Sequence, residues 1–433
     1  MVKNKIRHIT IGLILVLILT AFTGCAKNKD YGEEFNYKTD CQYSYDCSVV
    51  SWRDVQSDLN GQYIYKNNYI YYYDMDSDTL SPLCDKANCL HDKETDDKRK
   101  TECNAYATEN SFAYGDVMNN NANIQYYDDY IYYARANSLY RVSKDGSKKD
   151  TVFTSDEKLP INYWIIHRGV FYYETEPCYY GKNKDTQVYT RCVIKALTLS
   201  NKMKEKDAEI IHESDKKHTG IGFGPILAYK DYITFSYNAH RKDHVSKSNE
   251  DWLMNTTSYT YLYNTTTKDL SLITVPKGYN KTTCISGIHF LEDKILIKLY
   301  DDMKKQSYKL PIYSINYDLT DEKIWLDNTI PQGYNILIYK DYVIFEDVWY
   351  MDKLTEKCNY MIYDGNAKKV SEYICPAYKA VEHRGFGPDG VQVLFEENDS
   401  GCNIYELDIN NLLNLTGQEV KPKLIGKLSY TEE

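Results

Sequence analysis

The chain has 433 residues, of which 42% are hydrophobic and 26% are charged. These values are typical of a folded globular protein and exclude a disordered chain or one that crosses a membrane many times. The net charge of −10 disfavours nucleic acid and anionic lipid headgroups as partners, because both would repel an acidic surface. The 45 tyrosines favour a β-rich fold, since the tyrosine ring suits the half-buried surface of a strand.

The first 24 residues have the parts of an export signal. A basic stretch, MVKNKIR, precedes the apolar run IGLILVLILTAF, and small residues follow up to Cys25. The alternative, a plain transmembrane anchor, is disfavoured because the run from Ile9 to Phe22 is shorter than the roughly 20 residues that a spanning helix needs. The tetrapeptide FTGC resembles the lipobox of bacterial lipoproteins, with Phe22 in place of the usual leucine. We therefore expect residues 1–24 to be a lipoprotein signal peptide and Cys25 to carry the lipid.

The lipid on Cys25 would anchor the mature chain to the cell membrane, on the extracytoplasmic side. Residues from Ala26 to about Tyr45 are polar and lack hydrophobic periodicity, which is typical of a flexible tether. The sequence thus predicts a lipidated cysteine and tether over residues 25–48 and a folded domain over residues 49–433.

One short pattern recurs through this domain: an aromatic or apolar residue, two polar turn residues and an apolar run of strand type. It is typical of a β-hairpin. The copies centre near Tyr69, Tyr130, Val170, Tyr232, Ile295, Tyr342 and Val391. Most are followed by a second hairpin, and the resulting four-stranded sheets would be too small to bury their own faces. This predicts an all-β propeller of about seven blades, with six or eight as alternatives and a β-sandwich as the competing architecture.

Two smaller features repeat with the hairpins. The tetrapeptide GFGP occurs at residues 222–225 and again at residues 385–388, and we expect its glycines to mark equivalent tight bends. Aspartates also recur at one place in the repeat, where they are expected to form local turn hydrogen bonds. They are Asp129, Asp231, Asp293 and Asp341.

The strand and turn pattern that includes IYYARANSLYRVSKDG resembles TolB-like propellers, particularly domains of unknown function in lipoproteins of Firmicutes. The resemblance spans most of residues 60–425. It implies a propeller fold and a location on the bacterial cell surface, and it does not imply an established reaction.

A Cys/His-rich insert at residues 84–106 separates the first two hairpin repeats and resembles the Cys-Cys-His-Cys insert of such lipoproteins. Its four candidate ligands are Cys84, Cys89, His91 and Cys103. Three thiolates and an imidazole match a closed zinc site, which would clamp a polar insertion that has no core. The spacing is not that of a standard zinc finger, so a disulfide between two of these cysteines is favoured over metal in an oxidising compartment, with reduced thiols as the third alternative. A structural zinc ion is the one cofactor that the sequence suggests, and none is required.

Two further cysteine pairs are close in the sequence and flank predicted hairpins. Cys41 with Cys47 and Cys178 with Cys192 are candidates for local disulfides in an exported protein. Sequence does not fix the connectivity among the remaining cysteines.

Catalytic motifs are missing from the sequence: there is no nucleophile elbow, Walker loop, HExxH motif or dinucleotide fingerprint. The densest histidine segments contain His212, Glu213 and His218, and then His240 and His244. Both segments are charged and are expected to be solvated loops rather than metal sites.

The sequence therefore favours a non-catalytic binding or scaffolding propeller that recognises an extracellular peptide, glycan or partner protein. The abundant tyrosine is consistent with this function, although blade packing would account for most of the rings. The alternative is a surface glycoside hydrolase or lyase with paired acids at the mouth of the propeller channel.

Overall fold

The computed structural model describes residues 31–42, 54–107, 123–156, 161, 163–175, 178–180, 187–189, 193–214, 218–241, 248, 251, 254–305, 307–347, 357–376, 381–398 and 400–429. The chain divides into two compact units, residues 1–36 and residues 37–433. The predicted signal peptide and Cys25 lie outside the described residues. None of the helices in the described part of the chain has the length and apolar character needed to cross a lipid bilayer.

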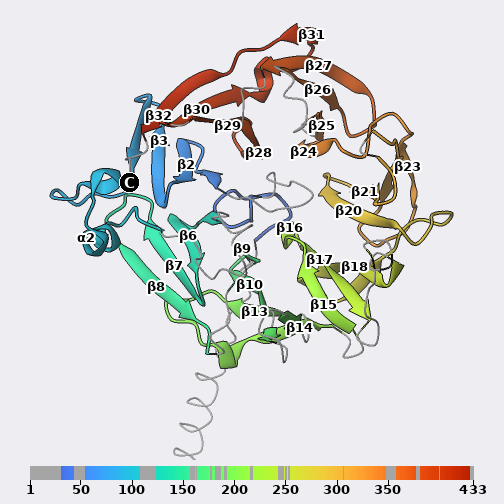
Figure 1. Ribbon diagram of the computed structural model, residues 1–433, viewed down its shortest axis with the longest axis horizontal. Helices are drawn as coiled ribbons and strands as arrows, with labels where there is room; N and C mark the ends of the chain where they lie inside the picture. Colours follow the sequence, from blue (N-terminus) through green and yellow to red (C-terminus); the bar gives the residue numbers. More distant parts are fainter. Residues whose placement is uncertain are drawn as a thin grey trace, which may run out of the picture. The chain divides into compact units, whose positions relative to one another are not determined.

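Seven antiparallel sheets, each four strands deep, follow one another around a ring in the second unit (Figure 1). We number these blades in chain order, and the strands of a blade from the first, at the ring axis, to the fourth, at the rim. The first strands of neighbouring blades contact one another, as in the pairs β1 with β5, β5 with β9, and β24 with β28. The all-β propeller prediction and the number of seven blades are confirmed, and the β-sandwich alternative is wrong.

Short turns join the strands of blades 1 and 2, whereas a longer segment separates the second and third strands of blade 3. Blade 1 consists of β1 (Val55–Ser57), β2 (Gly61–Lys66), β3 (Tyr69–Asp74) and β4 (Thr79–Pro82). Blade 2 consists of β5 (Ile124–Tyr127), β6 (Tyr130–Arg135), β7 (Ser138–Ser143) and β8 (Lys149–Thr154). Blade 3 consists of β9 (Trp164–His167), β10 (Val170–Thr175), β13 (Val193–Thr198) and β14 (Glu209–Glu213). A separate hairpin pairs β11 (Cys178–Tyr180) with β12 (Gln187–Tyr189).

Blades 4 and 5 have longer strands. In blade 4 the first strand is interrupted, so two segments pair with the same second strand. These are β15 (His218–Phe223) and β16 (Leu227–Tyr229), followed by β17 (Tyr232–Arg241), β18 (Thr256–Asn264) and β19 (Leu270–Ile273). Blade 5 consists of β20 (Thr283–Phe290), β21 (Ile295–Asp301), β22 (Ile312–Ile315) and β23 (Lys323–Leu326).

In the last two blades, one additional strand comes from the chain segment of blade 7 and pairs with the sheet of blade 6. Blade 6 consists of β24 (Asn335–Tyr339), β25 (Tyr342–Glu346), β26 (Lys357–Tyr363) and β27 (Lys369–Pro376). Blade 7 consists of β28 (Val381–Phe386), β29 (Val391–Asn398), β30 (Gly401–Asp408) and β32 (Lys423–Ser429). Between β30 and β32, β31 (Thr416–Glu419) leaves blade 7 and adds to the rim of blade 6 in parallel with β27. The described helices are short: η1 (His91–Lys93), α2 (Asp97–Glu102), η2 (Glu205–Asp207) and η3 (Ile409–Asn411).

The hydrophobic core lies between the blades rather than within them. One cluster joins blades 7, 1 and 2, another joins blades 4, 5 and 6, and three more fill the interfaces of blades 2 with 3, 3 with 4, and 6 with 7. Many tyrosines serve this packing, and the most deeply buried are Tyr63, Tyr73, Tyr126, Tyr173, Tyr360 and Tyr373. Burial of apolar area between sheets therefore stabilises each blade only in the presence of its neighbours.

Six of the seven hairpin copies join the first and second strands of their blades, and one does not. The turn at Asn67 and Asn68 joins the second and third strands of blade 1, because β1 precedes the hairpin. Both asparagines have positive φ (50° and 67°), as a two-residue turn of type I′ requires. The hairpin pattern thus predicts the turn correctly. It does not predict which strands of the blade the turn joins, because that depends on whether another strand, here β1, precedes the hairpin.

The two GFGP segments are not equivalent, contrary to the sequence prediction. The first lies in the interruption between β15 and β16, where a Cβ on Gly224 would be 2.3 Å from the Ser236 hydroxyl oxygen. The second ends β28 and begins its turn, in which Gly390 has a φ of +84°. The first copy allows close approach of two strands at Gly224, whereas the left-handed glycine near the second copy, Gly390, lies two residues beyond the tetrapeptide.

The turns that join first and second strands lie on one side of the ring, which we call the first-turn face. Polar contacts link adjacent turns there, so that the blades are connected as well as packed. The contacts are Arg168 Nη1 to Asp231 (2.6 Å), Lys230 Nζ to Glu292 (2.5 Å) and Glu292 N–H to Asp341 (3.3 Å).

Residues 37–42, which we call the N-terminal strap, are bonded to blades 1, 2 and 3 on this face. The bonds involve backbone and side chains of the strap. They are Lys38 O with Asp128 N–H (2.8 Å), Thr39 O with Arg168 N–H (2.7 Å), Cys41 N–H with His167 Nδ1 (3.0 Å), Asp40 with Arg168 Nε (3.0 Å) and Gln42 Oε1 with Ser57 N–H (2.9 Å). Thr39 to Gln42 are all buried. For these residues the prediction of a flexible tether is wrong, because the strap is part of the propeller.

Candidate metal centre

The Cys/His-rich insert lies on the outer rim, where blade 1 meets blade 2 (Figure 1). It leaves blade 1 after β4, forms η1 and α2, and returns to blade 1 at Tyr106, which forms a bridge with Tyr69. The helix α2 is capped by Asp96, the residue before its first turn, whose carboxylate accepts the Arg99 N–H (3.0 Å). Neither η1 nor α2 contains a buried residue. The insert therefore has no hydrophobic core in its helices.

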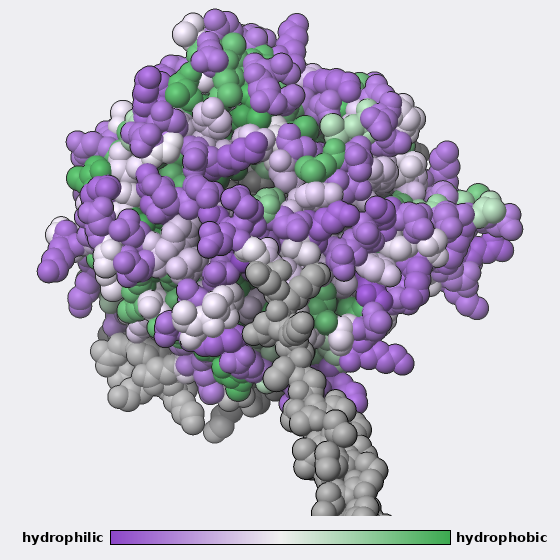
Figure 2. All heavy atoms as spheres, turned by 180° about the vertical axis from the view of Figure 1, so that it is seen from behind, coloured by the Kyte–Doolittle hydropathy of each residue, from purple (hydrophilic) through white to green (hydrophobic). Residues whose placement is uncertain are grey.

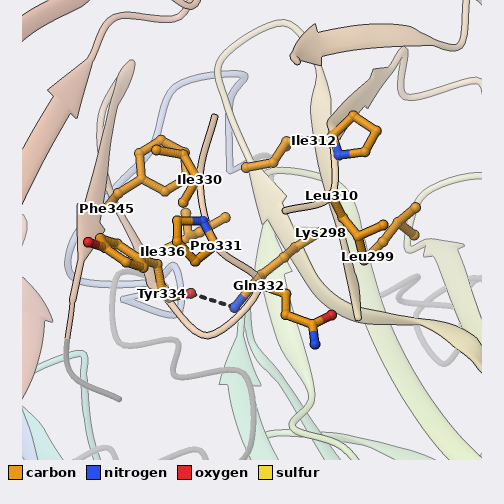
Figure 3. A pocket seen from close by; sticks show the side chains of 11 residues that line it. Lys298, Leu299, Leu310, Ile312, Ile330, Pro331, Gln332, Tyr334, Ile336 and Phe345 are labelled. Carbon is orange, nitrogen blue, oxygen red and sulfur yellow. Dashed lines mark hydrogen bonds between the residues drawn. The ribbon is translucent and has the colours of Figure 1, made fainter. Parts of the chain in front are cut away.

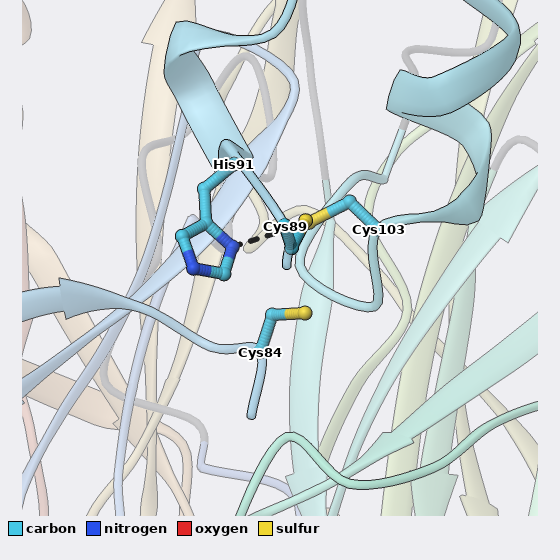
Figure 4. Close-up of side chains that lie close together, drawn as sticks. All are labelled: Cys84, Cys89, His91 and Cys103. Carbon is cyan, nitrogen blue, oxygen red and sulfur yellow. Dashed lines mark hydrogen bonds between the residues drawn. The ribbon is translucent and has the colours of Figure 1, made fainter. Parts of the chain in front are cut away.

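The four predicted ligands converge in this insert. One ligand atom from each of Cys84, Cys89, His91 and Cys103 lies within 4.8 Å of the other three (Figure 4). His91 Nδ1 and Cys103 Sγ are 3.7 Å apart. A tetrahedral zinc ion with Zn–S of about 2.3 Å and Zn–N of about 2.0 Å places its ligand atoms roughly 3.5–3.8 Å from one another. The set thus fits one ion after small side-chain movements.

The cysteines differ in how readily they would ionise. Burial raises the pKa of Cys103 to about 12, and the neighbouring thiols add to this shift. Burial also raises the pKa of Cys84, but hydrogen bonds from the backbone N–H groups of Lys86 and Asn104 outweigh it and leave the pKa below its ordinary value. A bound cation would favour the thiolate at every position, including Cys103.

None of these three cysteines is in a disulfide in the structure. A bond between any two of the sulfurs would leave the third sulfur and the imidazole beside it. The local bridges suggested for Cys41 with Cys47 and for Cys178 with Cys192 lie outside what the structure describes, because Cys47, Cys192 and the Cys178 side chain are not described.

The histidine segments are strands, and the expectation of solvated loops is wrong for the described part of them. His212 is on β14, where its ring packs against Tyr261 with centroids 4.5 Å apart and its Nε2 is 3.2 Å from the Tyr237 hydroxyl. Burial lowers the pKa of this imidazole. His218 and His240 are on the paired strands β15 and β17, and His244 lies outside the described residues.

The repeated aspartates do sit in turns, but two of them connect blades instead of bonding locally. Asp231 and Asp341 accept hydrogen bonds from the preceding blade, as described for the first-turn face. Asp129 accepts bonds from Tyr126 and Lys144 of its own blade (both 3.0 Å), and Asp293 pairs with the adjacent Lys294 (3.2 Å). The shared position in the repeat therefore serves contacts between blades at Asp231 and Asp341 and contacts within a blade at Asp129 and Asp293.

Several buried polar groups were not identified from the sequence. Glu346 is fully buried at the end of β25 and accepts the Tyr360 hydroxyl (2.7 Å). Cys358 and Cys375 are buried directly opposite each other on β26 and β27, and burial raises the pKa of each thiol to about 12. In the sequence, only their positions on either side of a predicted hairpin indicated that Cys358 and Cys375 would lie opposite each other.

A small pocket opens between blades 5 and 6 (Figure 3). Apolar side chains such as Leu310, Ile336 and Phe345 line it. Its one cationic group, Lys298 Nζ, donates to the Tyr334 carbonyl oxygen (2.6 Å). The pocket is a gap in the interblade core.

On the face shown in Figure 2 hydrophilic residues predominate, with smaller groups of apolar residues among them.

The sequence matches no family model and no curated protein. Among solved structures, the chain is similar to an oligogalacturonate lyase from Vibrio parahaemolyticus, with a TM-score of 0.51 and 10% identity over 87% of this chain and 92% of that one. It is also similar to a prolyl endopeptidase, with a TM-score of 0.50 and 11% identity over 91% of this chain. The chain spans about half the length (51%) of that endopeptidase. At such identities these likenesses concern the fold, and they agree with the geometry that this chain is a seven-bladed β-propeller protein.

Proposed function

We propose that the chain is a lipid-anchored protein outside the cytoplasm whose propeller binds an extracellular peptide, glycan or protein without chemically altering it. The observation that carries this proposal is the N-terminal strap. The segment that follows the predicted lipid attachment site is bonded to three blades, so a membrane anchor on Cys25 would hold the whole ring and not a loosely attached domain.

The distance from the anchor to the ring is short. Eleven residues separate Cys25 from Tyr37, and a fully extended segment of this length reaches roughly 40 Å. Because the strap lies on the first-turn face, the chain would reach the bilayer from that face. The connections between blades on the opposite face would then be available to a partner. An acidic chain would not bind anionic headgroups by charge, so the lipid would supply the attachment.

The anchor is tested by replacing Cys25 in the full chain expressed in a bacterial host. Native protein should incorporate labelled palmitate and sediment with membranes, whereas C25S should do neither. C284S, which changes a cysteine of blade 5, is the matched control and should behave as native. Native protein without acyl chains in the cytosolic fraction would refute the anchor.

Binding is tested with the detergent-solubilised full chain on glycan and peptide arrays, with product analysis of every hit. The panel should include oligogalacturonates, because an oligogalacturonate lyase shares the fold. Retention of a ligand that is recovered unchanged supports the binding function. Release of unsaturated or hydrolysed sugars would instead support a surface lyase or hydrolase, the alternative that the fold also accommodates.

A further inference from the structure

We propose that Cys84, Cys89, His91 and Cys103 bind one Zn²⁺ ion, and that this ion holds the insert in its folded form on the rim of the propeller. The site goes beyond the binding function, since neither the lipid anchor nor a ligand of the ring requires it. Three thiolates and one imidazole would fill a tetrahedral coordination shell without leaving an open position, which is typical of a structural zinc site and not of a catalytic one.

The first argument is that the two ends of the ligand set are held in place by blade 2. The turn between β7 and β8 packs against the backbone at Cys84, so closely that a Cβ on Gly146 would be 2.7 Å from the Cys84 nitrogen. The Gly146 carbonyl oxygen also accepts from the Asn104 side chain (2.7 Å), next to Cys103. Cys84 and Cys103 are therefore positioned by the propeller itself.

The second argument concerns the middle of the insert, which carries Cys89 and His91. It has no buried side chain in η1 or α2 to hold it against this framework. Ordering so many residues costs conformational entropy that burial of apolar area does not offset here. Metal bonds from Cys89 and His91 to the two fixed cysteines would supply the missing stabilisation, as they do in small domains that fold only with zinc.

The third argument is the charge beside the site. The half-buried ammonium of Lys149, on β8, donates to the carbonyl oxygens of Thr101 (3.2 Å), Cys103 (2.5 Å) and Tyr106 (3.3 Å). Three thiolates and a neutral imidazole around Zn²⁺ carry a net charge of −1, which this cation would partly neutralise. A disulfide would be neutral and would leave the ammonium without an anionic neighbour among these ligands. The charge arrangement therefore favours metal over the disulfide expected from the sequence.

Metal content is the direct test. The full chain, purified without chelator under reducing conditions, should contain about one zinc ion per molecule, and C84S, C89S, H91Q and C103S should each lose most of it. C284S is the control and should retain zinc. Native protein that takes up no zinc from excess Zn²⁺, or whose freshly isolated peptides show a disulfide within this set, would overturn the proposal.

Two measurements on the native sequence remain informative if a variant fails to fold. Replacement of zinc by Co²⁺ should give the intense visible bands of a tetrahedral site and a thiolate charge-transfer band in the near ultraviolet. Chelation should make the insert sensitive to trypsin at Arg99 and Lys100, while the blades remain protected. Octahedral Co²⁺ spectra, or unchanged cleavage of the insert after the metal is removed, would contradict a structural zinc clamp.

Discussion

Gly146 shows how one backbone position can control the contact between the propeller and the insert. Its φ is +72°, and a Cβ there would lie 2.7 Å from the Cys84 nitrogen and 2.8 Å from the Leu83 carbonyl carbon. An alanine would therefore add a backbone clash to the strain of a left-handed conformation.

We predict that G146A lowers the free energy of unfolding by about 1–3 kcal/mol, measured by urea denaturation. The matched control is G417A. Gly417 also has a positive φ (+92°), but no atom lies within 4 Å of its added Cβ, so only the backbone strain is introduced. Equal losses in the two variants would mean that the contact with Cys84 contributes nothing.

His289 is a second residue whose surroundings determine its chemistry. It is fully buried on β20, and burial together with the Lys298 ammonium lowers its pKa from 6.5 to about 3. The ring is thus neutral in the folded protein at a pH where the unfolded chain would protonate it. Stability from this residue is complete above pH 6.5 and is lost as the pH falls toward 3.

We predict that H289Q removes up to about 1.4 kcal/mol per pH unit from the slope of unfolding free energy against pH in this window. Urea denaturation at a series of pH values measures the slope. K304Q, an exposed change in the same blade, should leave the slope as it is, because it removes no histidine and no buried group. An unchanged slope in H289Q would show that other groups cause the acid sensitivity.

At the scale of elements, the N-terminal strap is the segment whose role the sequence least suggested. It is polar and aperiodic, so the pattern predicted a tether, but several of its bonds are made to residues more than a hundred positions away, His167 and Arg168. Hydrophobic periodicity predicts local structure only. Contacts between residues so far apart in the sequence produce no such periodicity, so the strap could not be predicted from it.

We predict that deleting residues 26–42 destabilises the propeller, whereas deleting residues 26–36 does not. The longer deletion removes Asp40, one of the two carboxylates that pair with the buried Arg168, and the hydrogen bonds of the strap to Asp128, Arg168 and His167, a loss of about 1–3 kcal/mol. Thermal unfolding of the two deletion proteins measures the difference. Identical midpoints would show that the strap contributes no stability.

The hairpins could be predicted from sequence because their turn residues are distinctive. Which strands of the blade a hairpin joins could not be predicted. Asn67 and Asn68 specify a tight turn wherever it occurs, while the strand before them, β1, has only three residues and no recognisable pattern. For the candidate site, the four ligands could be found from residue type and spacing. Lys149, Gly146 and Asn104 could not, since two of these come from blade 2 and act only after the ring has formed.

At the scale of the whole molecule, the first and last blades meet through side chains. Blade 1 is built from residues 55–82 and blade 7 from residues 381–429, and among the described strands none of one blade completes the sheet of the other. The junction contains the ion pair of Lys66 with Glu397, and Asp389 accepts hydrogen bonds from Ser57 (2.7 Å) and Gln62.

We predict that D389A costs about 1–3 kcal/mol of unfolding free energy, because the buried Ser57 and Gln62 lose a shared acceptor. D293A is the control: Asp293 is the exposed turn aspartate of blade 5 and pairs only with its neighbour Lys294 among the contacts described for it. Urea denaturation of both variants compares them. A loss in D293A as large as that in D389A would argue against a special role for the junction.

The strap has a mechanical consequence. A pull on the N-terminus would not peel away a single terminal strand, since Lys38 and Thr39 are bonded to the turns of blades 2 and 3 and Gln42 to blade 1. The load would be shared by three blades, on the side of the ring that would face the pull. A force applied through the strap would therefore reach the ring away from the junction of its first and last blades, which are held together by the packed core between them and by a few polar contacts.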